Sequence, residues 1–208
     1  MEKIYTIMIN EAFDDGEPMC PFCKIHTKLE NNELDLILGA SMMEPDIRIK
    51  TNELGFCDKH YAAMYSRKNR LGLALILESH LDHIRNHLNK LEKLETTCYV
   101  CERINYNLTH VFENAVYLFE KDNDFIHKIK RQKYFCLPHY RRFIESGKIN
   151  LPKKKINEFN EAVTEVMLQY FDELRNDVSW FCKKFDYRYE NEPWYNSKDA
   201  IERALKFL

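Results

Sequence analysis

Cys20-Pro21-Phe22-Cys23 and Cys57-Asp58-Lys59-His60 form a pattern that returns later in the chain as Cys98-Tyr99-Val100-Cys101 and Cys136-Leu137-Pro138-His139. The CxxC and CxxH parts are separated by 33 residues in the first copy and by 34 in the second. A single CxxC is a weak signal for a metal site, but two CxxC/CxxH sets with nearly equal gaps are specific. Each copy supplies three cysteines and one histidine.

Three thiolates and one imidazole are a common ligand set for structural zinc, which prefers four ligands in a tetrahedron. We therefore predict two zinc ions per chain, each bound within one copy of the pattern. The first site would use Cys20, Cys23, Cys57 and His60, and the second would use Cys98, Cys101, Cys136 and His139. The ligand types alone do not distinguish zinc from iron at such a thiolate-rich site.

The local sequence predicts the shape of each half-site. Pro21 presets φ for a turn at the first CxxC, and Pro18 keeps the approach to it non-helical. Cys57 and His60 precede residues 61–65, whose composition is helical, so both are predicted on the first turn of a helix. A thiolate is favoured there by the helix dipole, and Pro138 is compatible with the same position in the second copy.

Disulfide formation and thiol redox catalysis are two other uses of paired cysteines that compete with metal binding. Residues 1–19 contain five acidic residues and no long apolar run, so we expect no secretory signal peptide and a cytoplasmic chain with reduced thiols. This expectation disfavours disulfides. Cys20-Pro21-Phe22-Cys23 also looks like the active-site stretch of glutaredoxins, which makes a thiol oxidoreductase acting through Cys20 and Cys23 an alternative. The second copy lacks the proline, and glutaredoxins need no CxxH partner, so coordination is the preferred interpretation.

Composition indicates a globular chain of 208 residues, with 45% apolar and 31% charged residues. Five glycines favour helices over hairpins, and the longest apolar run, residues 71–77, is too short to cross a membrane. The predicted fold is mainly α, a single domain over residues 1–208 built of two repeats, about 1–95 and 96–208. The two copies of the metal pattern are offset by 78 to 79 residues.

Charge is distributed unevenly. Residues 1–60 carry 12 acidic and 6 basic residues, whereas residues 128–155 carry ten lysines and arginines against Glu145. A basic stretch of this density, Lys128 to Lys155, can bind phosphate backbones, so a nucleic-acid-binding regulator is a further alternative. The other interpretation is a solvated face, or a surface that complements the acidic half of a second copy. The oligomeric state is left open.

Apolar periodicity predicts helices at residues 24–38, 71–94, 103–119, 154–185 and 198–208. Residues 1–10 are interpreted as a short strand or an extended arm. Gly39 is expected to stop the first of these helices, Asn69 to cap the second and Ser197 to cap the last. Cys182, the one cysteine outside the metal pattern, is expected to be buried.

Two further groups of polar residues are candidates for a site. Residues 41–52 are interpreted as a loop broken by Pro45, in which Glu44, Asp46, Arg48 and Asn52 either line a pocket or, as we prefer, satisfy one another. His80, His83 and His87 lie on one side of the predicted helix 71–94. They suit a third metal or proton-transfer site, although a solvated histidine face is the preferred interpretation.

The chain resembles an uncharacterised family of bacterial cytoplasmic proteins, a domain of unknown function. The resemblance covers nearly the whole chain and rests on CPFC (20–23), MEPDIRIKTNELGFCDKHY (43–61), KNRLGLAL (68–75) and ENEPW (190–194). It implies paired Cys/His metal sites in a mostly helical body. It implies no substrate, partner or catalytic residue.

Together these observations predict a zinc-binding protein with two structural sites, a partner that is another protein, and no membrane association. Catalysis is disfavoured, because a catalytic zinc keeps an open position beside three protein ligands whereas both predicted sets have four.

Overall fold

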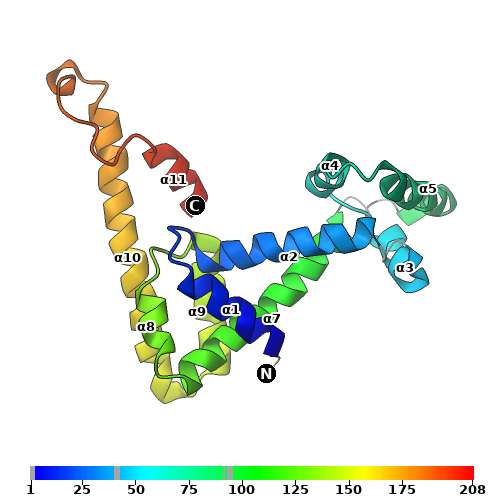
Figure 1. Ribbon diagram of the computed structural model, residues 1–208, viewed down its shortest axis with the longest axis horizontal. Helices are drawn as coiled ribbons and strands as arrows, with labels where there is room; N and C mark the ends of the chain where they lie inside the picture. The colour runs from blue at the N-terminus through cyan, green and yellow to red at the C-terminus, as the bar shows by residue number, and fades with distance from the viewer. Residues whose placement is uncertain (1–2, 40–42, 91, 93–95) are drawn as a thin grey trace. The chain divides into compact units, whose positions relative to one another are not determined.

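The structure, a computed structural model of the chain, describes residues 3–39, 43–90, 92 and 96–208. Within these residues it contains helices and no strand, which confirms the predicted fold class. The helices are α1 (Lys3–Asp14), α2 (Pro21–Leu38), α3 (Pro45–Leu54), α4 (Asp58–Ser66), α5 (Arg70–Asn86), α7 (Tyr99–Lys121), α8 (Phe125–Lys130), α9 (Leu137–Asn150), α10 (Lys153–Lys183) and α11 (Ala200–Phe207), with the short 3-10 helices η2 (Leu88–Lys90) and η3 (Tyr187–Tyr189) (Figure 1).

The chain divides into two compact units whose boundaries differ from those of the predicted repeats. Unit 1 contains Met1–Ile25 and His110–Leu208, and unit 2 contains His26–Thr109. Helices α2 and α7 each begin in one unit and end in the other. Each unit is therefore built from parts of both repeats.

Unit 1 is organised around aromatic side chains. Helix α10 contacts α8, α9 and α11, as Figure 1 shows. The ring of Phe143 on α9 lies 4.9 Å from that of Phe22 on α2 and 4.8 Å from that of Phe159 on α10. All three side chains are fully buried. Because Phe22 stands between the two cysteines of the first CxxC, that motif is anchored in the hydrophobic core of the unit.

Helix α1 corrects the expectation of a strand or an arm at residues 1–10. Tyr5, Ile9, Ala12 and Phe13 are buried, and their spacing of four, three and one places them on one face of a helix. The β-branched residues near the N-terminus suggested a strand, but helix packing overrides that weak preference. The ring of Phe13 lies 5.6 Å from that of Phe22, so α1 packs beside the first CxxC.

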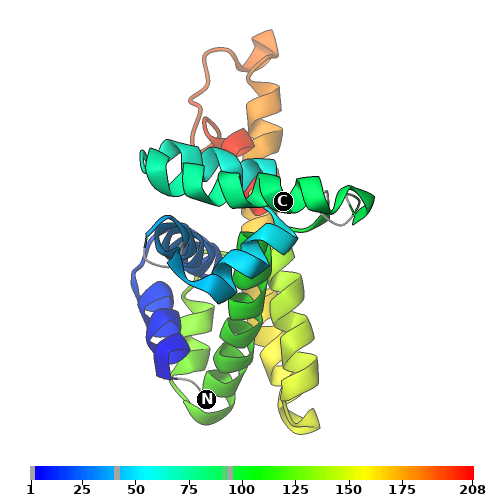
Figure 2. The same cartoon turned by 90° about the vertical axis from the view of Figure 1, so that its right-hand side faces the viewer.

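In unit 2, helices α3 and α4 both contact α5 (Figures 1 and 2). Helix α3 replaces the loop predicted at residues 41–52, of which 41 and 42 lie outside the described residues. Pro45 does not break this segment, because it occupies the first turn, where its missing N–H costs nothing. Asn69 caps α5 as predicted, accepting a hydrogen bond from the backbone of Gly72 at 3.0 Å.

The remaining helices agree with the periodic segments except at their ends. Helix α2 ends at Leu38, directly before Gly39. Helix α5 ends at Asn86, short of the predicted boundary, and Leu91 and Leu94 lie outside the described residues. Cys182 near the end of α10 is exposed, which corrects the expected burial, since it lies off the apolar stripe of that helix.

At the C-terminal end, Ser197 is buried, but its hydroxyl donates to the carbonyl of Trp194 at 2.7 Å, and Asp199 takes the cap position of α11. Among the described residues no helix combines the length and apolar character needed to cross a bilayer.

Candidate metal centres

The eight predicted ligands converge in two groups of four, but the partners are crossed between the two copies of the pattern. The first cluster consists of Cys20, Cys23, Cys136 and His139, and the second cluster consists of Cys57, His60, Cys98 and Cys101. In each group the ligand atoms lie within 4.8 Å of one another. The predicted pairing within each copy is therefore wrong, because each CxxC meets the CxxH of the other copy.

Helix lengths explain why the ligands within one copy do not meet. Helix α2 begins at Pro21 and has 18 residues, so it carries the chain about 27 Å away from the first CxxC. Helix α3 has ten residues and spans about 15 Å, too short to return the chain to its starting point before Cys57. The nearly constant spacing between the CxxC and CxxH motifs therefore reflects a repeated order of helices. It does not indicate that the two motifs of one copy meet.

The four half-sites share one local structure. Each has a cysteine immediately before a helix and a second ligand at the third residue of that helix: Cys20 and Cys23 at α2, Cys57 and His60 at α4, Cys98 and Cys101 at α7, and Cys136 and His139 at α9. The CxxC segments were predicted as turns, and they are instead the start of helices. This position favours negatively charged ligands, since the helix dipole and unpaired N–H groups lie there.

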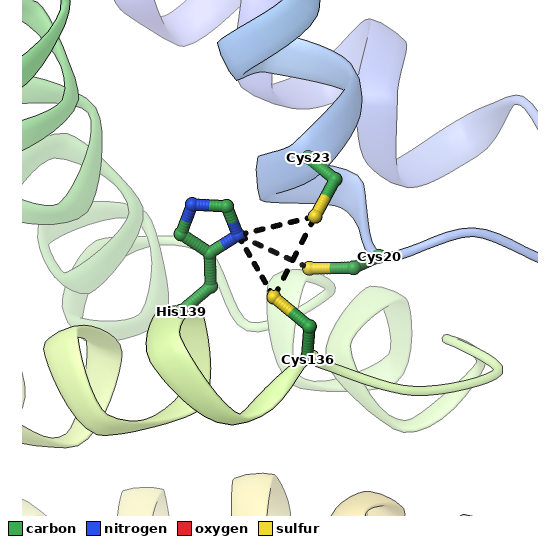
Figure 3. A group of neighbouring side chains, drawn as sticks. All are labelled: Cys20, Cys23, Cys136 and His139. Atoms are coloured by element: carbon green, nitrogen blue, oxygen red, sulfur yellow. Dashed lines mark hydrogen bonds between the residues drawn. The ribbon is translucent and has the colours of Figure 1, made fainter. Parts of the chain in front are cut away.

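In the first cluster, the ligand atoms of two helix starts point toward one another (Figure 3). The Nδ1 atom of His139 lies 3.1 Å from the sulfur of Cys136, 3.3 Å from that of Cys23 and 3.7 Å from that of Cys20. The sulfurs of Cys23 and Cys136 are 3.5 Å apart. The cluster closes around a single central point.

The second cluster has the same arrangement. The Nδ1 atom of His60 lies 3.2 Å from the sulfurs of both Cys57 and Cys98, and 3.5 Å from that of Cys101. The sulfurs of Cys57 and Cys101 are 3.9 Å apart. Both histidines thus present Nδ1 to the cluster, which leaves Nε2 to orient the ring.

In the second cluster, that orienting partner is Glu30. When Nδ1 of His60 is a ligand, its Nε2–H donates to Glu30 at 3.0 Å, and Lys59 lies 2.6 Å from the same carboxylate oxygen. Burial by itself would raise the pKa of Glu30, but the hydrogen bonds from Lys59 and His60 lower it overall. A carboxylate behind a ligating histidine fixes its tautomer and raises its basicity. Sequence analysis missed Glu30, because no motif marks it.

Backbone contacts hold the two halves of the second cluster together. Gly55 ends α3 with φ of +59°, a left-handed conformation that glycine adopts without strain. Its carbonyl accepts a hydrogen bond from the backbone N–H of Tyr99 at 3.0 Å. The hydroxyl of Thr97 donates to the carbonyl of Leu54 at 2.7 Å. These bonds join the residues just before Cys57 to those around Cys98.

The distances fit a tetrahedral zinc ion. Zinc bonds of about 2.3 Å to sulfur and about 2.0 Å to nitrogen would place sulfur pairs about 3.8 Å apart and sulfur–nitrogen pairs about 3.5 Å apart. The observed separations are 3.5 and 3.9 Å between sulfurs and 3.1 to 3.7 Å between sulfur and nitrogen. Both clusters therefore have the donor set and the size of a Cys3His site.

The ionisation of the cysteines supports the same conclusion. Hydrogen bonds from Cys20 and Cys23 lower the pKa of Cys136 far below that of an ordinary thiol. The contact with Cys136 raises the pKa of Cys23 to about 12, and burial raises the pKa of Cys20. Three sulfurs that meet at one point cannot all be charged unless a cation lies among them. A metal ion supplies that charge and deprotonates its thiol ligands.

The other candidate residues do not join a metal cluster. His80 is buried, contrary to the expected solvated face, and its Nδ1 lies 3.0 Å from the carbonyl oxygen of Asn52. His83 and His87 stack with ring centroids 4.2 Å apart. Arg48 donates to the carbonyl of Leu75 at 2.5 Å.

The amide oxygen of Asn52 also accepts from Ser79 at 2.9 Å, so Arg48 and Asn52 of α3 both form hydrogen bonds with α5. Glu44 precedes α3 and Asp46 lies in its first turn, and both are exposed.

The basic stretch 128–155 is partly neutralised within unit 1. Lys128 lies 2.5 Å from Asp14, Lys130 lies 3.0 Å from Glu165, and Lys133 lies 2.6 Å from Glu173. Arg131 and Arg141 also lie within 4.0 Å of carboxylates. About half of the basic side chains in the stretch therefore have acidic neighbours.

Comparison with known proteins gives a family and no activity. The family model described as "Family of unknown function (DUF6062)" matches residues 1–93 and 84–208, which is consistent with the internal duplication. No curated protein matches the chain, and no solved structure matches it.

Proposed function

Because the chain belongs to DUF6062, a family of unknown function, we propose a function from its two clusters: each binds one zinc ion as a structural site, and the protein is a zinc-stabilised helical module that binds another protein. The observation that carries the proposal is the convergence of four ligand atoms within 4.8 Å in each cluster. Each set is complete with four protein ligands, which is characteristic of structural zinc.

The first experiment is elemental analysis of the protein purified under reducing conditions. We expect two zinc ions per chain and no stoichiometric iron. Replacing the zinc with cobalt should give the visible absorption of a tetrahedral, thiolate-rich site. Clearly fewer than two metal ions per chain, or iron in place of zinc, would contradict the proposal.

Double variants test the crossed ligand sets directly. Cys20→Ser/Cys136→Ser damages the first cluster alone and should leave one zinc ion bound. Cys20→Ser/Cys57→Ser damages both clusters and should leave none. Pairing within each copy of the pattern would reverse these two results. Cys182→Ser is the matched control and should retain both ions, since Cys182 belongs to neither cluster.

Exposed aromatic side chains beyond α10 support a role in protein binding. Phe185 is 76% exposed, Tyr187 is 85% exposed and Tyr195 is 66% exposed. Protein interfaces are enriched in Phe, Tyr and Trp, which supply large contact areas. Under this proposal, Phe185→Ser/Tyr187→Ser lowers the recovery of a partner in affinity capture while zinc content and helicity are unchanged. Equal recovery of the partner by the unsubstituted protein and by the double variant would argue against these aromatic residues as the binding surface.

The two alternatives receive less support. A thiol oxidoreductase acting through Cys20 and Cys23 needs a reactive thiol within reach of substrate, whereas Cys20 is 0% exposed and Cys23 is only partly exposed. Nucleic-acid binding needs free basic charge, whereas many of the basic side chains at 128–155 lie beside carboxylates. Reduced zinc-bound thiols are suited to the cytoplasm, and we propose that compartment for the protein.

A further inference from the structure

The two clusters differ in how far solvent reaches their sulfurs. In the second cluster Cys101 is exposed and Cys57 is partly exposed. Both belong to the lining of a surface hollow of about 340 Å³, completed by Thr96, Thr97, Cys98, Glu102 and Asn105. A small solute can therefore approach these two sulfurs directly.

The cysteines of the first cluster are more enclosed. Cys20 is 0% exposed, Cys136 is 4% exposed and Cys23 is partly exposed, whereas none is exposed as Cys101 is. Phe22, between the two cysteines of the CxxC, is fully buried, and its ring lies 6.1 Å from that of His139. Figure 3 shows the side chains of this cluster directed inward between the starts of two helices.

We propose that Cys57 and Cys101 are an oxidation site for peroxide, at which a disulfide forms and the second zinc ion is released. This inference rests on the proposed function, because it starts from the zinc-loaded protein. Zinc-bound cysteines are thiolates, and the thiolate is the nucleophile in cysteine oxidation. Three thiolates around one divalent zinc ion leave a net negative charge, so the sulfurs keep their electron density. Exposure then decides which of them reacts.

The reaction balances in two steps. The Cys101 thiolate attacks one oxygen of hydrogen peroxide, the O–O bond breaks, and a sulfenic acid and hydroxide form. The Cys57 thiolate then attacks the Cys101 sulfur, the S–O bond breaks, and a disulfide and a second hydroxide form. Two sulfurs are oxidised by one electron each, and the peroxide is reduced by two electrons, with solvent protons converting hydroxide to water.

Geometry favours Cys57 as the resolving thiolate. Its sulfur lies 3.9 Å from that of Cys101, and of the two other cysteines that line the hollow, Cys57 and Cys98, it is the more exposed. Cys98 is 5% exposed. Once the disulfide forms, His60 and Cys98 are the remaining ligands of the second cluster. These two residues alone would not hold a zinc ion against solvent, so the second cluster would lose its metal.

The test uses the zinc-loaded full chain carrying Cys182→Ser, which removes the exposed cysteine outside the clusters. Hydrogen peroxide is added, zinc release is followed with a chromogenic chelator, and disulfides are located by peptide mapping. One zinc ion should leave about tenfold faster than the other, because oxidation follows thiolate exposure. The early product should contain the Cys57–Cys101 disulfide, and a thiol reductant with added zinc should restore two ions per chain.

Asn105→Phe provides a variant outside the ligand set. Asn105 is exposed on α7 four residues after Cys101, so it lies on the same face of the helix and at the same hollow. A bulky ring there should retain both zinc ions and slow release from the second cluster several-fold, because it covers the exposed sulfur. As a measurement independent of this variant, N-ethylmaleimide should modify Cys101 before any other cluster cysteine of the Cys182→Ser protein.

Equal release rates from the two clusters, first modification at Cys20 or Cys23, or a disulfide that omits Cys101 would overturn the inference while leaving two structural zinc sites intact. A protein that contains fewer than two zinc ions before peroxide is added would overturn both proposals. Zinc content is therefore measured first, which keeps the two failures distinct.

Discussion

The two units hold the same ligand set on the same kind of helix start, but different packing surrounds it. The fully buried phenylalanines all belong to unit 1: Phe22, Phe125, Phe135, Phe143, Phe159 and Phe207. The largest fully buried side chains of unit 2 are aliphatic: Leu34, Ile37, Met64 and Ile76. Equivalent ligand clusters therefore lie in units whose hydrophobic cores differ in composition, aromatic in unit 1 and aliphatic in unit 2.

This difference indicates how much of each unit depends on metal. A buried Phe, Leu or Met side chain contributes about 1.5–3 kcal/mol relative to an exposed one. A structural zinc ion contributes about 10–16 kcal/mol, as much as the whole stability of a small domain. Under the proposed zinc binding, the ion would be the larger share of the stabilising free energy in unit 2, where fewer large side chains are buried. In unit 1 it would add to the stability of an aromatic core.

Zinc removal is the largest test of this comparison. A strong chelator under reducing conditions should unfold α4 and α5 of unit 2 and leave part of the helix content of α9 and α10 in unit 1. Hydrogen exchange followed by mass spectrometry would show rapid exchange of unit 2 amides, with slower exchange across α10. Equal loss of protection from exchange in both units would show that the aromatic core does not keep unit 1 folded without metal.

A substitution in the aromatic core tests unit 1 separately. At Gly147, an added Cβ would lie 2.3 Å from the Cε1 atom of Phe159, a fully buried ring. Gly147→Ala should therefore destabilise unit 1 by about 1–3 kcal/mol despite the better helix propensity of alanine, because overpacking forces the ring to move. Thermal unfolding of the zinc-loaded protein measures the effect.

Lys148→Ala is the control, since Lys148 is exposed on the same helix and should change stability by less than about 0.5 kcal/mol. An unchanged unfolding temperature for Gly147→Ala would show that Phe159 can move at little cost.

The smallest expected effect is confined to the second cluster. Glu30→Gln removes the carboxylate that accepts from His60 and should lower zinc affinity there about 10- to 100-fold, as is typical for such partners. The affinity of the first cluster should be unchanged. Competition with a chelator of known zinc affinity measures the affinity of each cluster separately.

Asp35→Asn is the matched control for Glu30→Gln. It removes the same charge from the same helix, but Asp35 pairs with Arg67 and its side chain is 67% exposed. Equal weakening by both variants would indicate a general charge effect instead of an oriented histidine.

The sequence was sufficient to predict the helical class and the eight residues that converge in the clusters, because both follow from local spacing. The partner of each CxxC was not predicted correctly, since pairing is decided by where long helices carry the chain. The length of residues 24–38 as a helix already implied that Cys57 would lie far from Cys23. The prediction placed one helix and a loop between Cys23 and Cys57, whereas the chain has two helices there, α2 and α3.

The other errors have similar physical causes. Tyr5, Ile9 and Phe13 formed a helical stripe that the neighbouring apolar residues Ile4 and Ile7 obscured. Pro45 was interpreted as a residue that prevents a helix, although proline is also favoured in the first turn of a helix. Glu30 could not be found from sequence, because its role depends on a histidine 30 residues away.

The crossed ligand sets also impose an order of events during synthesis. Cys23 and its partner His139 are 116 residues apart in the chain. At a translation rate of about 5–20 residues per second, the first cysteine pair to leave the ribosome waits roughly 6 to 23 s for the rest of its binding site. The second cluster is completed earlier, when Cys101 emerges. Under the proposed zinc binding, the nascent chain would therefore bind its metal ions in the reverse of the order in which their first ligands are made.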